Sequence, residues 1–137
     1  MSRVGGVLPM SWHEVWERKS QLVNDSRPTL ADLIAMDGFD KGAGQFSIAD
    51  WRSYTTHVLT SLGIKSGDSV CEIGCGAGAM LYAFREQGIR VTGVDYSNSL
   101  ITTAHRAMPD TEFYVAEAKR VPYADNRFDA VLSHSVF

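Results

Sequence analysis

The sequence predicts an α/β protein built on a doubly wound parallel sheet, and three observations support this fold class. A short apolar run at residues 70–73 leads directly into a loop with glycine at alternating positions. A helical run follows that loop at once, which gives the order strand, glycine loop, helix. Apolar runs of strand length then alternate with helical segments as far as residue 133. Such alternation is typical of parallel strands joined by right-handed crossovers.

Composition narrows the classes of function. The 137 residues suit one domain, and 45% hydrophobic with 21% charged residues is ordinary for a globular protein. The formal net charge is −3 and there is no basic run, so no nucleic-acid partner is expected. Residues 1–10 do not read as a signal peptide and no long apolar run is present. We therefore expect no membrane partner and a cytoplasmic location.

Capping residues predict three helices before the first strand. Ser, Thr and Asp side chains at a helix start bind the first free amides, and Gly63 is a typical C-terminal stop. Trp51 falls on the apolar stripe of the third helix, so we expect it in the core rather than at a ligand. The expected helices are residues 12–22 after Ser11, 30–36 after Thr29, and 48–62 after Ser47.

The glycine-loop region begins a regular series of strands and helices. Turn residues separate the apolar runs, and Gly88 ends the helix that follows the glycine loop. The expected strands are residues 70–73, 90–95, 112–116 and 128–133, with helices at 79–87 and 98–108.

The glycine loop is the main candidate ligand site. Glycine lacks a Cβ, so a ligand can touch the main chain, and the next helix presents its N-terminal amides there. Gly74, Gly76 and Ala79 fit the dinucleotide pattern G-x-G-x-x-G/A. Glu72, however, lies within the strand two residues before the first glycine. A carboxylate there attracts a cation and repels a phosphate.

Residues 72–78, Glu-Ile-Gly-Cys-Gly-Ala-Gly, resemble the first motif of the class I S-adenosylmethionine (SAM) dependent methyltransferases, an acidic residue followed by G-x-G-x-G. The run at residues 121–137 also resembles the family's stretch around the fourth strand. The resemblance implies a Rossmann-like fold whose seven strands have the order 3-2-1-4-5-7-6, with SAM as cofactor. It further implies cofactor binding by Glu72, Gly74, Cys75, Gly76 and Gly78.

A second acidic residue ends the second strand. Asp95 follows Gly74 by 21 residues, and a carboxylate at this place can accept hydrogen bonds from both ribose hydroxyls. The resemblance implies that Tyr96 lies against the adenine face. It also implies that the corner at Glu117 and Ala118 meets the adenine edge, although the family usually has Asp where this chain has Glu117.

The carboxyl end of the fourth strand supplies the remaining candidates. Ser133 and His134 stand there, at the expected mouth of the site. Ser133 is expected to contact the cofactor, and His134 is the candidate general base. Cys71 and Cys75 have no second Cys or His pair at ligand spacing, so no metal is expected.

The function that the resemblance implies is methyl transfer from SAM to an O, N, C or S nucleophile of a small molecule. The protein would mainly position the two reactants and exclude water. Two alternatives stay open. The match of Gly74, Gly76 and Ala79, together with Asp95, also suits an NAD(P)-dependent oxidoreductase domain. The second alternative is a module that binds SAM without catalysing a reaction.

The domain organisation is expected to have two parts. Residues 1–46 resemble the lid helices of small-molecule methyltransferases, and residues 47–137 resemble the SAM-binding core. Only strands one to four of the expected seven have sequence here, so we expect the amino-terminal part of a larger protein. The fourth strand would then be an open sheet edge, which is normally covered. A second copy of the chain is one candidate to cover it.

Overall fold

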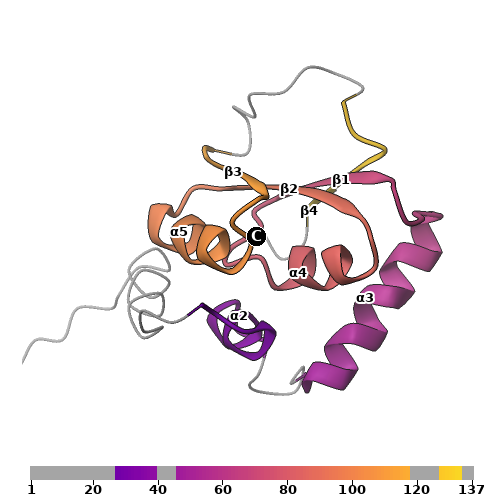
Figure 1. Cartoon of the computed structure of the whole chain (residues 1–137), viewed down its shortest axis with the longest axis horizontal. Coiled ribbons are helices and arrows are strands. Elements are labelled where there is room, and N and C mark those ends of the chain that lie inside the picture. The colour runs from indigo at the N-terminus through magenta and orange to yellow at the C-terminus, as the bar shows by residue number, and fades with distance from the viewer. Residues whose placement is uncertain (1–26, 40–45, 118–126, 134–137) are drawn as a thin grey trace, which may run out of the picture.

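The computed structural model describes residues 27–39, 46–117 and 127–133. Its centre is a four-stranded sheet in the order β3-β2-β1-β4, and all three strand pairings are parallel (Figure 1). This arrangement confirms the α/β prediction and matches the expected order of the first four strands. The strands are β1 (Ser69–Ile73), β2 (Arg90–Asp95), β3 (Glu112–Val115) and β4 (Ala130–Ser133).

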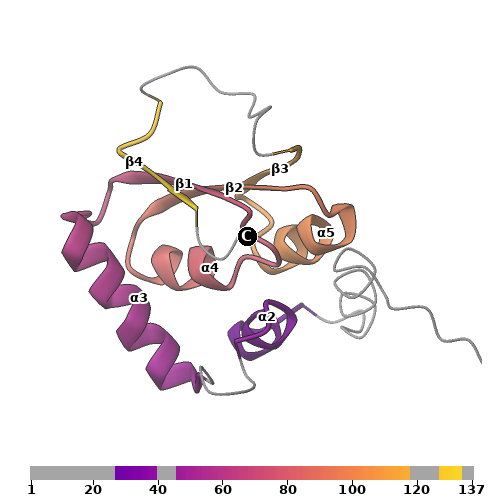
Figure 2. The same cartoon turned by 180° about the vertical axis from the view of Figure 1, so that it is seen from behind.

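The four described helices cover the same face of the sheet, as Figures 1 and 2 show from opposite sides. Each begins close to its predicted start; the predicted helix at residues 12–22 lies outside the described residues. None of these four helices is both long and apolar enough to cross a bilayer. The helices are α2 (Leu30–Met36), α3 (Ile48–Leu62), α4 (Ala79–Glu86) and α5 (Asn98–Ala107).

Side-chain caps explain why the helices start where they do. The Thr29 side chain accepts from the amide of Asp32, and Ser47 does the same for Asp50. In both cases the aspartate side chain in turn accepts a hydrogen bond from the backbone N–H of the cap residue, which completes the capping box. Gly63 ends α3 in the left-handed conformation, at φ 68°. These local signals are strong enough to be read from sequence.

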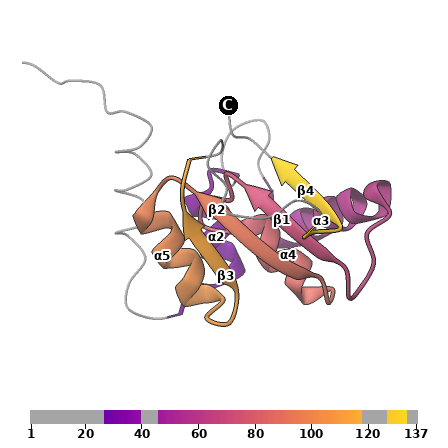
Figure 3. The same ribbon diagram turned by 90° about the horizontal axis from the view of Figure 1, so that it is seen from above.

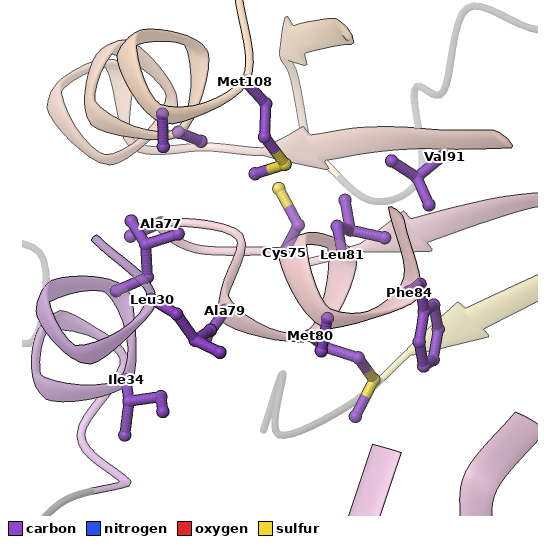
Figure 4. Packing of buried hydrophobic residues seen from close by; sticks show 14 of the residues in the cluster. Leu30, Ile34, Cys75, Ala77, Ala79, Met80, Leu81, Phe84, Val91 and Met108 are labelled. Carbon is purple, nitrogen blue, oxygen red and sulfur yellow. The ribbon is translucent and has the colours of Figure 1, made fainter. Parts of the chain in front are cut away.

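The hydrophobic core lies between the sheet and its helices. Trp51, Leu81 and Phe84 are fully buried there, and burying a side chain of this size stabilises the fold by about 1.5–3 kcal/mol. Figure 4 shows Leu30 and Ile34 of α2 on the side of that helix facing Ala79 and Met80 of α4. Helix α2 and the sheet therefore share one core. The division at residue 46 stays a prediction.

The parallel register brings the carboxyl ends of all four strands to one edge of the sheet (Figure 3). Ile73 pairs with Val94 on one side and with Ser133 on the other. Asp95 pairs with Val115 at the end of β3. The last residues of the four strands thus lie along this edge, where ligands bind in open parallel sheets.

The edge strand β4 pairs only with β1 within the described part of the chain. Its Val131 side chain is 58% exposed. Association of two copies through this edge stays a prediction. Strand β4 begins at Ala130, two residues later than expected, and the preceding Asp129 instead accepts a bond from the Ser69 amide at 2.7 Å.

Candidate cofactor-binding site

The glycine loop follows β1 in a conformation that needs glycine. Gly74, Gly76 and Gly78 all have positive φ, at 78°, 58° and 87°. A Cβ at Gly76 would collide with the carboxylate of Asp37, and one at Gly78 would lie 2.8 Å from the Met108 methyl. The loop can therefore pass close to its neighbours only because these positions lack a side chain.

Every backbone N–H from Gly74 to Ala79 donates to a partner inside the protein. The first two amides share the Val94 carbonyl oxygen, at 2.7 and 3.0 Å. Gly76 donates to Asp95 Oδ1 at 3.1 Å, and Gly78 donates to the Cys75 carbonyl at 3.0 Å. Ala77 and Ala79 donate to the two oxygens of Asp37. A dinucleotide loop instead points such amides at a pyrophosphate.

Asp37 is a site residue that sequence reasoning missed. It directly follows the last residue of α2, and it caps that helix through its backbone N–H. Its side chain reaches the amide of Ala77 at 2.8 Å and that of Ala79 at 3.0 Å. These contacts span 40 and 42 residues of sequence, so no local pattern could reveal them. The only signal was an acidic residue directly after a predicted helix.

Glu72 is the most unusual group at the site. Its side chain is 3% exposed, and its Oε1 has no hydrogen-bond partner in the described part of the chain. Burial raises the pKa of this carboxyl well above its usual value, and the nearby charges of Asp37 and Asp95 raise it further. An unpaired buried carboxyl beside two others is unfavourable without a cation.

Asp95 lies at the end of β2, where it was predicted, but it already binds the backbone. Its Oδ1 accepts from Gly76, and its Oδ2 accepts from the Ser97 amide at 3.0 Å. Ribose hydroxyls would have to share these two hydrogen bonds with the backbone or replace them.

Tyr96, next to Asp95 in the chain, is 48% exposed, which suits a ring that stacks on a ligand. Glu117 is exposed after β3, close to Asp95, whose carbonyl accepts from the Ala116 amide.

Cys75 turns its side chain away from the loop and into the core. It is 4% exposed, and Figure 4 shows its sulfur pointing toward Met108. Burial, followed by the charge of Glu72, raises the pKa of the Cys75 thiol well above its usual value and that of Cys71 to about 11. Both cysteines are free thiols with little thiolate character.

The remaining candidates are only partly placed. Ser133 is exposed at the end of β4, beside Ile73. His134 and Ala118 lie outside the described residues, so their predicted roles are untested. Within the described ranges, no group of three or more His, Cys, Asp or Glu side chains could hold a metal ion.

The arrangement fits SAM better than a dinucleotide. SAM carries a positive sulfonium and an α-ammonium group. The site offers the carboxylates of Asp37 and Asp95 and the buried carboxyl of Glu72, whose Oε1 has no hydrogen-bond partner among the described residues. A pyrophosphate would meet these negative charges and find the loop amides already bonded. The residues present therefore suit SAM as the bound group.

Comparison with known proteins gives one family match and relatives with two different named activities. Residues 71–137 match the family described as methyltransferase domain. A demethylmenaquinone methyltransferase of Beutenbergia cavernae is 33% identical over 81 residues, which are 59% of this chain and 32% of that protein. A uroporphyrinogen decarboxylase of Mycolicibacterium paratuberculosis is 34% identical over 113 residues, 75% of this chain and 31% of the relative. The chain spans about a third of these relatives.

A solved structure described as an S-adenosyl-L-methionine-dependent methyltransferase from Methanococcus maripaludis has the same fold. The TM-score is 0.60 at 18% identity, over 83% of this chain and 54% of the other. The sheet and glycine loop thus define a Rossmann-like α/β protein. The family match over residues 71–137 and the acidic G-x-G-x-G motif make this part of the chain similar to the class I SAM-dependent methyltransferases.

Proposed function

We propose that the protein transfers a methyl group from SAM to an O, N, C or S atom of a small molecule. The fold and the family both support SAM as the methyl donor. The relative that acts as a demethylmenaquinone methyltransferase supports a small-molecule acceptor. We also propose the cytoplasmic location that the sequence predicts.

One observation carries the proposal: the glycine loop is lined by carboxylates and keeps its amides bonded inside the protein. Asp37 and Asp95 contact the loop, and Glu72 is buried beside them with one oxygen that has no hydrogen-bond partner among the described residues. Such a site stabilises positive charge, and the methyl group of SAM is attached to a positive sulfur. The same observation disfavours the NAD(P)-dependent oxidoreductase alternative.

The chain's own residues would act by binding and positioning. SAM supplies an electrophilic methyl carbon. Glu72 would face the cationic part of the ligand, and Asp95 with Tyr96 would hold the ribose and adenine. Because the strand ends meet at this edge, an acceptor held beside Ser133 would lie near the same site. Correct alignment of two reactants removes much of the entropy barrier to their reaction.

The proposal is tested by incubating the protein with SAM labelled in the methyl group and a panel of quinols, phenols, amines and thiols. We expect label to appear in at least one small-molecule product. The Glu72→Gln variant should lower that rate, and Glu86→Gln on the α4 surface is the matched control. Binding of SAM without transfer to any acceptor would favour the non-catalytic SAM-binding module instead.

A further inference from the structure

Asp37 occupies the anion position at the start of α4. Helix N-termini attract anions because their first amides lack partners within the helix. Here the amides of Ala77 and Ala79 are both bonded to one carboxylate, at 2.8 and 3.0 Å. That carboxylate belongs to the protein, so the place where a dinucleotide-binding Rossmann fold holds its pyrophosphate is already filled.

The surroundings of Asp37 fix it in this position from two sides. The helix before it, α2, is anchored by buried Leu30, Leu33, Ile34 and Met36. Two residues later, the ring of Phe39 stacks on Trp51 at a centroid distance of 4.7 Å. Trp51 in turn donates from Nε1 to the carbonyl of Ala79 at 2.9 Å. The segment that carries Asp37 and the first turn of α4 are therefore held by the same buried contacts.

Glu72 gives an independent indication of what the site accepts. It comes from β1 rather than from α2, it is 3% exposed, and its Oε1 lacks a hydrogen-bond partner among the described residues. The charge of Asp37 acts on it directly. Two acids from unrelated parts of the chain thus lie close enough at the glycine loop to affect each other's charge. A cationic ligand group satisfies both, whereas an anionic group is repelled by both.

We infer that Asp37 is a specificity-determining residue, whose carboxylate excludes phosphate-bearing ligands from the glycine loop and so selects SAM over dinucleotides. This inference rests on the proposed function for the identity of the favoured ligand. The exclusion of anions rests on the contacts of Asp37 alone. Asp37 acts by occupying the loop amides and by placing a negative charge beside them, and it takes no part in the chemical step.

The inference is tested with Asp37→Ala and Asp37→Asn, and with Asp110→Asn as the matched control. Asp110 carries the same charge and pairs with Arg85 of α4, but its side chain is 79% exposed. Calorimetric titration measures the affinities for S-adenosylhomocysteine, NAD and inorganic pyrophosphate. Amide NMR shifts of Ala77 and Ala79 report whether pyrophosphate reaches the loop, and circular dichroism reports folding.

We expect Asp37→Ala to bind pyrophosphate at least about tenfold more tightly than the wild type, because two amides lose their carboxylate. The ratio of S-adenosylhomocysteine affinity to NAD affinity should fall by a similar factor. Pyrophosphate should shift the two amides in the variant only. Asp37→Asn keeps the shape but not the charge, so it should show a smaller change in the same direction. It also decides the matter if Asp37→Ala does not fold.

Several results would overturn the inference. An unchanged preference among the three ligands in both folded variants would mean that Asp37 only stabilises the fold. Tighter S-adenosylhomocysteine binding in both variants would mean that Asp37 blocks the cofactor instead of selecting it. If the wild type binds no S-adenosylhomocysteine, the proposed function fails, but the pyrophosphate comparison still tests the role of Asp37.

Discussion

Glu72 shows how a single residue can serve binding at the expense of stability. Its carboxyl is buried beside two other acids and keeps one oxygen without a hydrogen-bond partner in the described structure. Such a group lowers the free energy of unfolding when it ionises. A bound sulfonium or ammonium group would offset this loss. The residue is therefore expected to limit the stability of the free protein and to favour the liganded one.

The first prediction concerns pH. Because the folded-state pKa of Glu72 is raised, the folded state holds a proton more strongly than the unfolded one. This tighter proton binding contributes to the free energy of unfolding. The contribution is fully present below the usual carboxyl pKa, near 4.5, and is lost as pH rises through the folded-state pKa. Glu72→Gln should therefore gain stability relative to the wild type as pH increases, reaching about 1 kcal/mol or more.

Urea unfolding between pH 4 and pH 8 measures this effect. Glu86→Gln, which breaks an exposed pair with Arg52, is the control and should change stability by less than about 1 kcal/mol at any of these pH values. A Glu72→Gln variant that is less stable than the wild type throughout the range would show that the buried carboxyl is well compensated.

The second prediction concerns Asp95. Asp95→Ala removes the acceptor for the Gly76 and Ser97 amides as well as the expected ribose contact. We expect S-adenosylhomocysteine to bind at least about tenfold more weakly, because one or two charge-assisted hydrogen bonds to the ligand are lost. S-adenosylhomocysteine lacks the sulfonium charge, so this measurement leaves out any contribution of that charge to binding. An unchanged affinity in a folded variant would remove Asp95 from the cofactor site.

At the scale of elements, residues far apart in sequence hold the loop in place. The tryptophan of α3 reaches the first turn of α4 and donates to the Ala79 carbonyl. Phe39, Phe46 and Tyr54 pack around that ring, with the stacked partner Phe39 at 4.7 Å. This cluster joins α2, α3 and α4 into one support beneath the glycine loop.

Element boundaries were largely predictable because their causes are local. The capping boxes at Thr29 and Ser47 and the stop at Gly63 can each be read within four residues of sequence. The reach of Asp37 to the loop could not be predicted, because it depends on how α2 packs against α4. The inward turn of the Cys75 side chain likewise depends on space beside Gly93, where a Cβ would meet its sulfur.

The third prediction tests the support under the loop. Trp51→Phe keeps a buried ring but removes the Nε1 donor and leaves the Ala79 carbonyl without that bond. We expect the free energy of unfolding to fall by about 1–3 kcal/mol, the typical effect of losing a buried hydrogen bond and some packing volume. Denaturant unfolding measures the change. His57→Ala, at an exposed position of the same helix, should stay within about 0.5 kcal/mol of the wild type.

At the scale of the whole molecule, the order β3-β2-β1-β4 decides where function lies. Parallel pairing brings the ends of β1, β2 and β4 to one edge, and residues predicted from separate motifs gather there. Glu72, the glycines and Asp95 were predictable because each sits at a strand end with a recognisable pattern. The identity of the methyl acceptor was not predictable, because no sequence pattern among the described residues marks a site that binds it.

The measurement that tests the identity of the ligand most directly is calorimetric titration of the wild-type protein with SAM, S-adenosylhomocysteine and NAD. We predict binding of both SAM-type ligands, no measurable binding of NAD, and a preference for SAM over S-adenosylhomocysteine that Glu72→Gln reduces, because only SAM carries the sulfonium charge. Binding of NAD with equal or greater affinity would contradict the assignment of the glycine loop to SAM, as would a folded protein that binds none of the three.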